Sequence, residues 1–465
     1  MRDNGPLKIG LAPIKRGTTR METALLQKQL ILQRMADITP ENVALVGIED
    51  VLPEGLLYCH DQVAAVEKAF KRAGVHALFL PHCDFGCEEV VGQLAKRMGV
   101  PVLIWGNRDP YPDYPGGKDR DTQCGTLAST KALQRYGVPF SYILNTDVED
   151  APLKRGFEDF CAVANVVRRF RGMRILLAGT RPQAFLSVIY NEDELLRRFG
   201  IEVYPWGSAA WLEAADRILA ERADEVTREM QAFARQVDVS DLTYERQRRQ
   251  AALVLALCEM AERHDIDGVA MECWSLLPER YGISGCQIVG QLCQRGLPCA
   301  CEGDVLGAVT AVMMQAAALD KEPVFFSDIT SRHPEQDNTE LLWHCGPYPP
   351  SLAHPDTPPK STFHGRGAFQ LKNGPITIAR LDAANGRYSL FSGEGRGVDG
   401  PPKKGNYVWL EVDCWADWEE KIVFGPYIHH VAGAYGQYSQ ILSEACKYLG
   451  GVSPDPMRPV KRVLG

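Results

Sequence analysis

The chain has 465 residues and a formal net charge of −8, with 45% hydrophobic and 24% charged residues. This length exceeds what one hydrophobic core supports, so we expect two or three domains, and without a clustered basic run we expect no nucleic-acid partner. No apolar stretch reaches the ~20 residues of a membrane span and the first residues form no apolar signal segment, so we expect a cytoplasmic protein whose 14 cysteines are free thiols.

Short apolar runs alternate with amphipathic helical runs in the first part of the chain. The expected strands are Lys8–Ile14, Val43–Gly47, Val75–Pro81, Pro101–Trp105 and Phe140–Leu144. The expected helices are Met21–Met35, Gln62–Ala73, Glu88–Met98, Thr126–Tyr136 and Phe157–Phe170. This alternation predicts a doubly wound α/β domain, Rossmann- or flavodoxin-like, with ligand groups at the carboxyl ends of its parallel strands.

A long loop follows Trp105. It contains Arg108, the proline-rich stretch from Pro110 to Gly117, and Gln123. Long loops at strand ends are often binding loops, and the alternative is a surface excursion. No GxGxxG follows a strand of the expected α/β units and GxxxxGK[ST] does not occur, so a nucleotide site lacks its phosphate-binding loop.

A second α/β unit is expected from Arg174–Gly179 onwards. Its helices are Trp211–Arg235, Tyr244–Arg263, a helix near Cys286–Gln294, and Leu306–Ala318. Its further strands are Gly268–Glu272, Cys299–Cys301 and Pro323–Phe326. The spacing again favours a doubly wound parallel sheet.

The pattern changes after about Asp328, where Pro and Gly become frequent. Runs of period two then appear at Ile376–Leu381, Tyr388–Phe391 and Tyr407–Val412. They predict antiparallel strands and a β-rich barrel or sandwich, with Gly425–Gly436 as a loop and Gln437–Tyr448 as the last helix. The expected domains are residues 1–173, 174–328 and 329–465.

Carboxylates stand at two predicted strand ends. Glu272 ends one apolar strand, while Glu302 and Asp304 flank Gly303 between another strand and its helix. A buried charge costs roughly 2–7 kcal/mol or more unless it is paired or bound to a metal. The alternatives are a capping or salt-bridged Glu272, and Asp304 as the N-cap of the helix.

Histidines near apolar residues are the other candidate ligands. His344 lies between Trp343 and Cys345, and His429 and His430 are adjacent in a segment bordered by glycines. A hydrogen-bonded core histidine is the alternative at each position. Together, Glu, Asp and His suit Mn²⁺ or Mg²⁺, which can coordinate two vicinal sugar oxygens while a carboxylate moves a proton between adjacent carbons.

The segment from Gly268 to Ser351 resembles the L-fucose/L-arabinose isomerase-like family. The similarity rests on Ala300-Cys301-Glu302-Gly303-Asp304-Val305, Gly307-Ala308, Asn338-Thr339, Trp343-His344-Cys345-Gly346 and the late Ile428-His429-His430-Val431. The resemblance implies two α/β domains and a C-terminal barrel. It also implies Mn²⁺ (or Mg²⁺, Co²⁺ or Zn²⁺), aldose–ketose interconversion through a cis-enediol, and a homo-oligomer, dimer to hexamer, with sites near subunit contacts.

The resemblance also implies roles for single residues. Glu272 and Glu302 are expected as acid/base carboxylates that also contact the metal, with His344 and His430 as further ligands. In the fucose branch the second carboxylate falls at Asp304, which therefore stays an alternative for both roles.

The implied substrate is a hexose, deoxyhexose or modified hexose, fucose-like or sulfoquinovose-like. The expected substrate contacts are Arg16, Trp105, Arg108, Gln123, Trp274 and His429, the two arginines suiting an anionic substituent. The alternatives are an L-arabinose-type pentose isomerase, a metal-dependent aldolase or dehydratase, and a sugar-binding protein without catalysis.

Overall fold

The computed structural model describes residues 5–110 and 120–465, and the chain divides into two compact units. The N-terminal unit holds Gly5–Arg168 together with Lys461–Gly465, and the C-terminal unit continues from Arg169 to Val460. The finer division into three domains at residues 173 and 328 stays a prediction.

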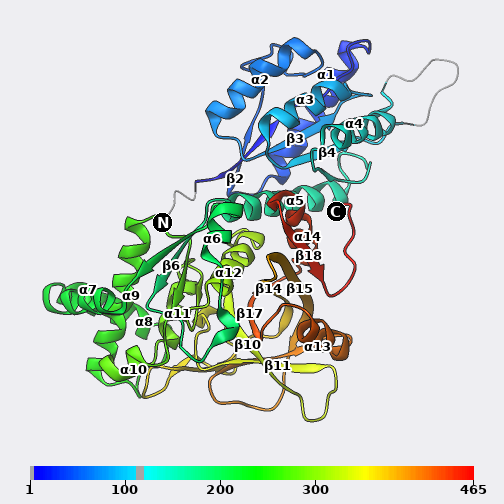
Figure 1. The fold of residues 1–465 in the computed structure, drawn as a ribbon. Coiled ribbons are helices and arrows are strands. Elements are labelled where there is room, and N and C mark those ends of the chain that lie inside the picture. Colours follow the sequence, from blue (N-terminus) through cyan, green and yellow to red (C-terminus); the bar gives the residue numbers. More distant parts are fainter. Residues whose placement is uncertain (1–4, 111–119) are drawn as a thin grey trace. The chain divides into compact units, whose positions relative to one another are not determined.

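A parallel sheet organises the N-terminal unit, with strand order β2-β1-β3-β4-β5 (Figure 1). Its strands are β1 (Leu7–Leu11), β2 (Val43–Val46), β3 (Ala77–His82), β4 (Val102–Gly106) and β5 (Ser141–Tyr142). Its helices are α1 (Met21–Ile38), α2 (His60–Ala73), α3 (Glu88–Met98), α4 (Thr122–Tyr136) and α5 (Ala151–Phe170).

Helices cover both faces of this sheet because side chains alternate between its two faces. Helices α1 and α5 pack on one face, where Phe157 contacts Phe79 of β3. Helices α2, α3 and α4 pack on the other face around Leu78, the residue before Phe79 in the same strand. The doubly wound arrangement expected from the sequence is confirmed.

The predicted loop after Trp105 is described only at its two ends, since residues 111–119 lie outside the described part. Asn107 anchors the first end. Its amide donates to Gln27 (2.8 Å) and accepts from the backbone N–H of Val148 (3.0 Å).

A second parallel sheet opens the C-terminal unit, with strand order β7-β6-β8-β9. Its strands are β6 (Arg174–Ala178), β7 (Glu202–Trp206), β8 (Gly268–Met271) and β9 (Cys299–Ala300). The helices around it are α6 (Glu192–Glu194), α7 (Ser208–Glu221), α8 (Ala223–Ala234), α9 (Tyr244–Arg263), α10 (Leu276–Tyr281), α11 (Cys286–Gln294) and α12 (Val305–Ala317), with single turns η1 (Leu186–Val188) and η2 (Leu195–Phe199). The single helix expected over Trp211–Arg235 is two helices, because Arg222 leaves the helical region (φ −128°, ψ 44°).

A closed antiparallel barrel forms most of the rest of this unit. Its strands are β10 (Phe325–Arg332), β11 (Thr339–His344), β14 (Gly374–Ala384), β15 (Arg387–Val398), β16 (Asn406–Glu411) and β17 (His430–Tyr435). The order β16-β11-β10-β17-β14-β15 closes where β15 pairs with β16. The expected barrel is confirmed. The segment predicted as a loop, Gly425–Gly436, contains β17, whose small residues Gly433 and Ala434 lack the usual strand signal.

The remaining elements surround the barrel. They are β12 (Lys360–Ser361), β13 (Gly367–Gln370), β18 (Val452–Pro456), α13 (Trp415–Phe424), α14 (Ser439–Leu449) and the single turn η3 (Pro350–Leu352). Helix α12 is buried along its whole length, and it packs against β8 and β9 of the sheet as well as β14 and β17 of the barrel. It therefore connects the two halves of the unit.

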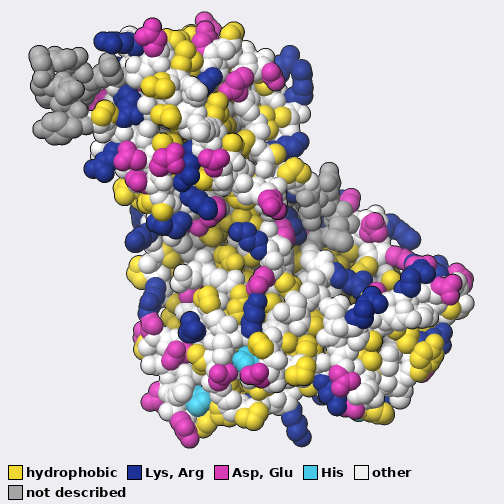
Figure 2. Space-filling model, turned by 180° about the vertical axis from the view of Figure 1, so that it is seen from behind, with side chains coloured by type: hydrophobic (Ala, Val, Ile, Leu, Met, Phe, Trp, Pro, Cys, Tyr) yellow, Lys and Arg dark blue, Asp and Glu magenta, His cyan; other side chains and the backbone are white. Residues whose placement is uncertain are grey.

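Acidic and basic side chains are interspersed over the face of the molecule in Figure 2. Among the helices that the structure describes, none is long and apolar enough to cross a membrane.

Gly433 provides a test of the barrel packing. It pairs with Phe325 across β17 and β10, and a Cβ at position 433 would lie 2.2 Å from the buried Phe325 ring. We expect Gly433→Ala to destabilise the C-terminal unit by about 1–3 kcal/mol, because a filled core cannot take up the extra methyl group. Urea unfolding measures the change. Gly207→Ala, where a Cβ meets nothing within 4 Å, is the matched control, and equal unfolding of the two variants would contradict this packing.

Candidate functional site

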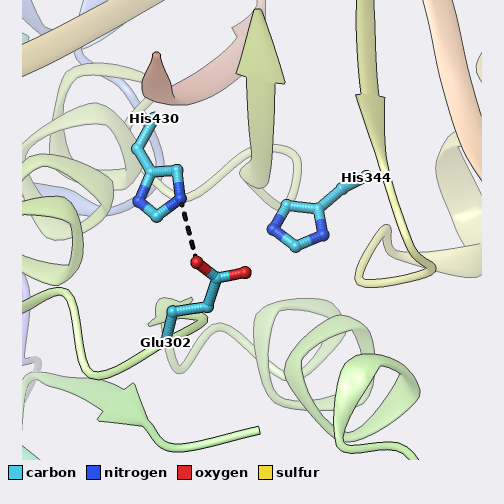
Figure 3. A group of neighbouring side chains, drawn as sticks. All are labelled: Glu302, His344 and His430. Atoms are coloured by element: carbon cyan, nitrogen blue, oxygen red, sulfur yellow. Dashed lines mark ion pairs between the residues drawn. The ribbon is translucent and has the colours of Figure 1, made fainter. Parts of the chain in front are cut away.

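The turn between β9 and α12 presents the first carboxylate of the site. Glu302 and Gly303 are both left-handed, with φ of 64° and 65°. A left-handed residue other than glycine costs on the order of 1–3 kcal/mol, and such strain gathers at functional sites. A Cβ on Gly303 would lie 3.0 Å from the backbone nitrogen of Arg181, so only glycine fits there without a shift. The turn points Glu302 towards His430 and His344 (Figure 3).

Asp304, two residues later, is fully buried and uses both of its oxygens. It caps α12 by accepting from the backbone N–H of Gly307 (2.8 Å), and it pairs with Arg380 of β14 and with Nδ1 of His430 (2.9 Å). Burial raises the pKa of Asp304, but the Arg380 guanidinium and the His430 hydrogen bond outweigh it and hold that pKa well below its usual range. Asp304 is therefore an ionised carboxylate that neighbouring side chains satisfy.

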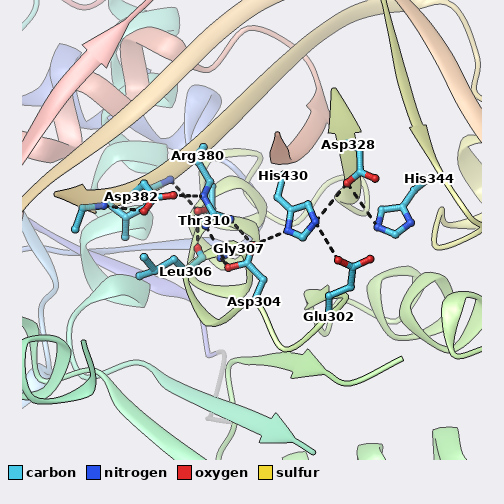
Figure 4. Close-up of polar contacts among 12 residues, drawn as sticks. Glu302, Asp304, Leu306, Gly307, Thr310, Asp328, His344, Arg380, Asp382 and His430 are labelled. Carbon is cyan, nitrogen blue, oxygen red and sulfur yellow. Dashed lines mark hydrogen bonds and ion pairs between the residues drawn. The ribbon is translucent and has the colours of Figure 1, made fainter. Parts of the chain in front are cut away.

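His430 receives its orientation from Asp304. An ionised carboxylate only accepts hydrogen bonds, so the neutral ring carries its proton on Nδ1 and leaves the lone pair of Nε2 free. Nε2 faces Oε2 of Glu302 at 3.5 Å and Oδ1 of Asp328 at 3.4 Å (Figure 4). Burial lowers the pKa of His430, but its hydrogen bond to Asp304 and the nearby Glu302 carboxylate raise it above the ordinary value.

His344 is the last residue of β11 and faces the same point, but its neutral ring is the opposite tautomer to that of His430. Its Nδ1 accepts from the backbone N–H of Cys345 (2.9 Å), so the neutral ring carries its proton on Nε2, which lies 3.8 Å from Oδ1 of Asp328. Burial lowers the pKa of His344, but the charge of Asp328 outweighs burial and raises that pKa to about 10.

Buried polar atoms converge between these residues without hydrogen bonds. Within the described ranges, Nε2 of His344, Nε2 of His430 and Oδ1 of Asp328 have no hydrogen-bond partner. Such atoms are rare and costly in native structures unless a water or ion satisfies them. One ligand atom each from Glu302, His344 and His430 lie within 4.8 Å of one another, as do those of Asp328, His429 and His430. Carboxylates and imidazoles in this arrangement fit a divalent cation.

A pocket of about 310 Å³ adjoins this centre. Its lining residues are Cys273, Trp274, Pro278, Ser284, Cys286, Glu302, Cys345 and Arg366. The volume is at the lower end of the roughly 300–1,000 Å³ of small-molecule pockets. Burial raises the pKa of Glu302, but the neighbouring side chains of His430 and Trp274 lower it below the usual value, so the pocket has an ionised carboxylate in its wall.

Glu272 lies at the carboxyl end of β8, as expected, but its carboxylate is hydrogen-bonded elsewhere. It accepts from the backbone N–H of Thr180 (3.2 Å) and from the hydroxyls of Ser208 (3.4 Å) and Ser275 (3.1 Å). Among the described side chains it belongs to neither converging group. Its catalytic and metal-binding roles stay predictions.

The predicted substrate contacts divide between the two units. Trp274 lines the pocket, and the exposed His429 lies beside Phe185 (ring centroids 5.7 Å apart). Arg16, Arg108 and Gln123 are in the N-terminal unit, and their roles stay predictions.

Trp105 has a different role from the one expected. It is fully buried in the core of the N-terminal unit, and its indole N–H donates to Thr146 (3.4 Å). The structure therefore assigns Trp105 a packing role in place of the expected substrate contact.

Sequence reasoning missed two residues of this region. Asp328 lies on β10, which continues beyond the strand end expected at Phe326. A carboxylate that follows an apolar strand was the signal for Glu302, and the same signal was available for Asp328. Arg366, in the motif Gly365-Arg366-Gly367, has no sequence signal that distinguishes it from a surface arginine.

Comparisons with known proteins identify the family of the chain. Residues 10–171 match the model of the fucose/sulfoquinovose isomerase N-terminal domain, and residues 359–453 match that of the L-fucose isomerase C-terminal domain. Curated proteins named sulfoquinovose isomerase from Priestia aryabhattai and Priestia megaterium are each 23% identical over 446 residues, which cover 94% of this chain and 96% of theirs. A third, from Alkalicoccus urumqiensis, is 22% identical over 344 residues, which cover 72% of this chain and 75% of its own. The chain belongs to the fucose-isomerase-like family of aldose–ketose isomerases.

Proposed function

We propose that the enzyme is a metal-dependent isomerase of a hexose modified at its terminal carbon, with sulfoquinovose as the first candidate substrate. The observation that carries this proposal is the convergence of buried, unpartnered nitrogen and oxygen atoms beside a sugar-sized pocket with Glu302 in its wall. The near full-length match to the Priestia sulfoquinovose isomerases supports the choice of substrate.

His430, Glu302 and Asp328 are the proposed metal ligands. His430 presents a free Nε2 lone pair with a carboxylate oxygen within 3.5 Å on either side. Two carboxylates and one imidazole suit Mn²⁺ or Mg²⁺. His344, whose Nε2 carries the proton in its neutral form, then serves as a donor to Asp328 or, after changing tautomer, as a fourth ligand. When bound, the ion supplies Lewis-acid polarisation of the sugar carbonyl and hydroxyl oxygens.

Glu302 is the proposed base. It is ionised and lines the pocket, so it can take the proton from C2 of the open-chain aldose while the carbonyl oxygen gains a proton. The resulting cis-enediol collapses to the ketose when the same proton returns to C1 and the C2 hydroxyl loses its own. Trp274 donates to Glu302 and so holds the carboxylate in place between the two transfers.

The resemblance also predicts a homo-oligomer with sites near subunit contacts and a cytoplasmic location. Both remain predictions.

Replacing Glu302 tests the base. We expect Glu302→Gln to lower kcat by about 10²–10⁴-fold, because the amide has the same shape but cannot accept a proton. The measurement is conversion of sulfoquinovose to its ketose with Mn²⁺ added, with circular dichroism to verify the fold. Glu340→Gln, a change at another buried carboxylate of the barrel, is the matched control and should leave turnover near normal. Near-normal turnover in Glu302→Gln would remove Glu302 from this role.

Metal content distinguishes the neighbouring histidines. We expect His430→Ala to lose bound Mn²⁺, because it removes the free Nε2, whereas His429→Ala keeps most of it because its ring is exposed. Elemental analysis after chelation and reloading measures the ratio of metal to protein. Asp328→Asn, in which the new side chain has nearly the same size as the old one, should also lose Mn²⁺. It serves as a second test in case His430→Ala folds poorly. Equal metal content in all three variants would contradict the ligand set.

Metal binding should depend on pH. The pKa of His344 is raised to about 10, so its ring holds a proton at pH 7 in the metal-free protein, and the pKa of His430 is raised above its ordinary value. A metal ion must displace protons from its ligands, so we expect Mn²⁺ affinity to rise with pH towards about 10, with proton release on binding. Calorimetry in buffers of different ionisation enthalpy measures that release. Constant affinity without proton release would show that the proposed histidines do not bind the ion.

A further inference from the structure

Arg366 lies in the hairpin between β12 and β13, in the wall of the pocket that contains Glu302. The hairpin is closed by backbone bonds from Thr362 to Arg366 (2.8 Å) and from Gly365 to Thr362 (2.9 Å). Gly365 has φ of 76°, which suits the turn that places Arg366 at the start of β13.

Two contacts with Ser284, a buried residue of the pocket, hold the hairpin in place. The backbone N–H of Ser284 donates to the carbonyl of His364 (2.7 Å), and Nε of Arg366 donates to the Ser284 hydroxyl (3.1 Å). Although Arg366 is exposed, these contacts hold the hairpin and the Nε end of the guanidinium in place before any ligand arrives.

The backbone also approaches the turn that follows His344. A Cβ on Gly346 would lie 2.2 Å from the backbone nitrogen of Gly367, so a side chain at position 346 would push the hairpin away. Gly346 also has φ of 136°, which a residue with a side chain rarely adopts. The glycine in Trp343-His344-Cys345-Gly346 thus lets the backbone at Arg366 pack directly against the turn that follows His344.

Arg366 is an exposed residue that has no carboxylate partner in the described part of the protein. None of the described carboxylates forms an ion pair with it, and its two terminal nitrogens make no hydrogen bond to a described residue. Nearby arginines differ in this respect. Arg181 donates to three carbonyls of its own loop, and Arg249 pairs with Glu245. Arg366 is therefore the cation in the described lining of the pocket.

The charges in the pocket wall indicate what kind of ligand it accepts. Glu302 is the carboxylate of the described lining and Arg366 is its cation, so a negatively charged group of a ligand is attracted to the Arg366 side of the pocket. Arginine offers paired N–H donors that match the oxygens of a sulfonate or phosphate group, and Ser284 adds a hydroxyl. We propose that Arg366, oriented by Ser284, binds an anionic substituent of the hexose and makes the enzyme selective for sugars that carry one; this inference rests on the proposed function.

Paired substrates test the selectivity. Sulfoquinovose and 6-deoxy-D-glucose differ only by the sulfonate. We expect Arg366→Gln to lower kcat/KM for sulfoquinovose by about 10²-fold, mostly through KM, because it removes a charge-assisted contact made in both ground and transition states. Activity on 6-deoxy-D-glucose should stay within about two-fold, and Arg366→Lys should keep an intermediate preference because it retains the charge without the planar pair of donors. The matched control is Arg246→Gln, at an arginine stacked on Phe363 (3.8 Å) that does not line the pocket.

A binding measurement separates this inference from the proposed function. Methyl sulfoquinovoside has a blocked anomeric carbon and cannot isomerise, so calorimetry with it and with methyl 6-deoxyglucoside reports recognition alone. If the wild-type protein prefers the sulfonated glycoside and Arg366→Gln does not, the anion site stands, even in a protein that converts no aldose. Glucose 6-phosphate bound more tightly than sulfoquinovose, with the same dependence on Arg366, would support the site with phosphate as its anion. Equal binding of the two glycosides by the wild-type protein, or an unchanged preference in Arg366→Gln, would overturn the inference.

Discussion

The buried carboxylate of Asp304 imposes the constraint on which the rest of the site depends. It starts α12, and it is neutralised by Arg380 from β14 and hydrogen-bonded by His430 from β17. Removing one partner of a buried ion pair typically destabilises a protein by about 3–5 kcal/mol, because the other charge is left without compensation. Since α12 packs on both the parallel sheet and the barrel, this carboxylate fixes the sheet-to-helix turn relative to two barrel strands. The turn that carries Glu302 and the strand that carries His430 can therefore meet reproducibly.

The same constraint divides the work between two neighbouring carboxylates. Asp304 uses its oxygens within the protein, so it orients His430, whereas Glu302 keeps a carboxylate directed towards the centre and the pocket. Family resemblance leaves both carboxylates as candidates, and the hydrogen bonds of Asp304 favour Glu302 as the carboxylate that faces the centre. The arrangement also has a cost for stability, since Glu302 and Asp328 crowd negative charge around His430, and Glu302 adopts a left-handed backbone. Local strain and like charges of this kind persist where function requires them.

The sequence predicted the architecture better than the site, for identifiable reasons. Alternating apolar and amphipathic runs carry the periodicity of strands and helices, so both parallel sheets and the existence of the barrel could be foreseen. Strand β17 could not be foreseen, because Gly433 and its small neighbours have low strand propensity. They fit beneath the Phe325 ring, where a larger side chain has no room. Trp105 shows a second limit of sequence analysis. The sequence does not reveal whether an aromatic ring at a strand end faces a ligand site or packs into the core. The unpaired buried oxygen that singles out Asp328, and the pocket wall that singles out Arg366, exist only in three dimensions.

The position of Arg366 in the pocket wall also bears on how a sugar is oriented. A monosaccharide has similar hydroxyl groups along its length, so hydrogen bonds alone discriminate poorly between its two ends. An anionic group removes this ambiguity, because it is attracted to Arg366. The terminal carbon that carries the anion is then held at the hairpin, and the carbonyl end is left for the carboxylates. On this argument Arg366 selects the substrate and also sets which carbons face the base, although it takes no part in proton transfer.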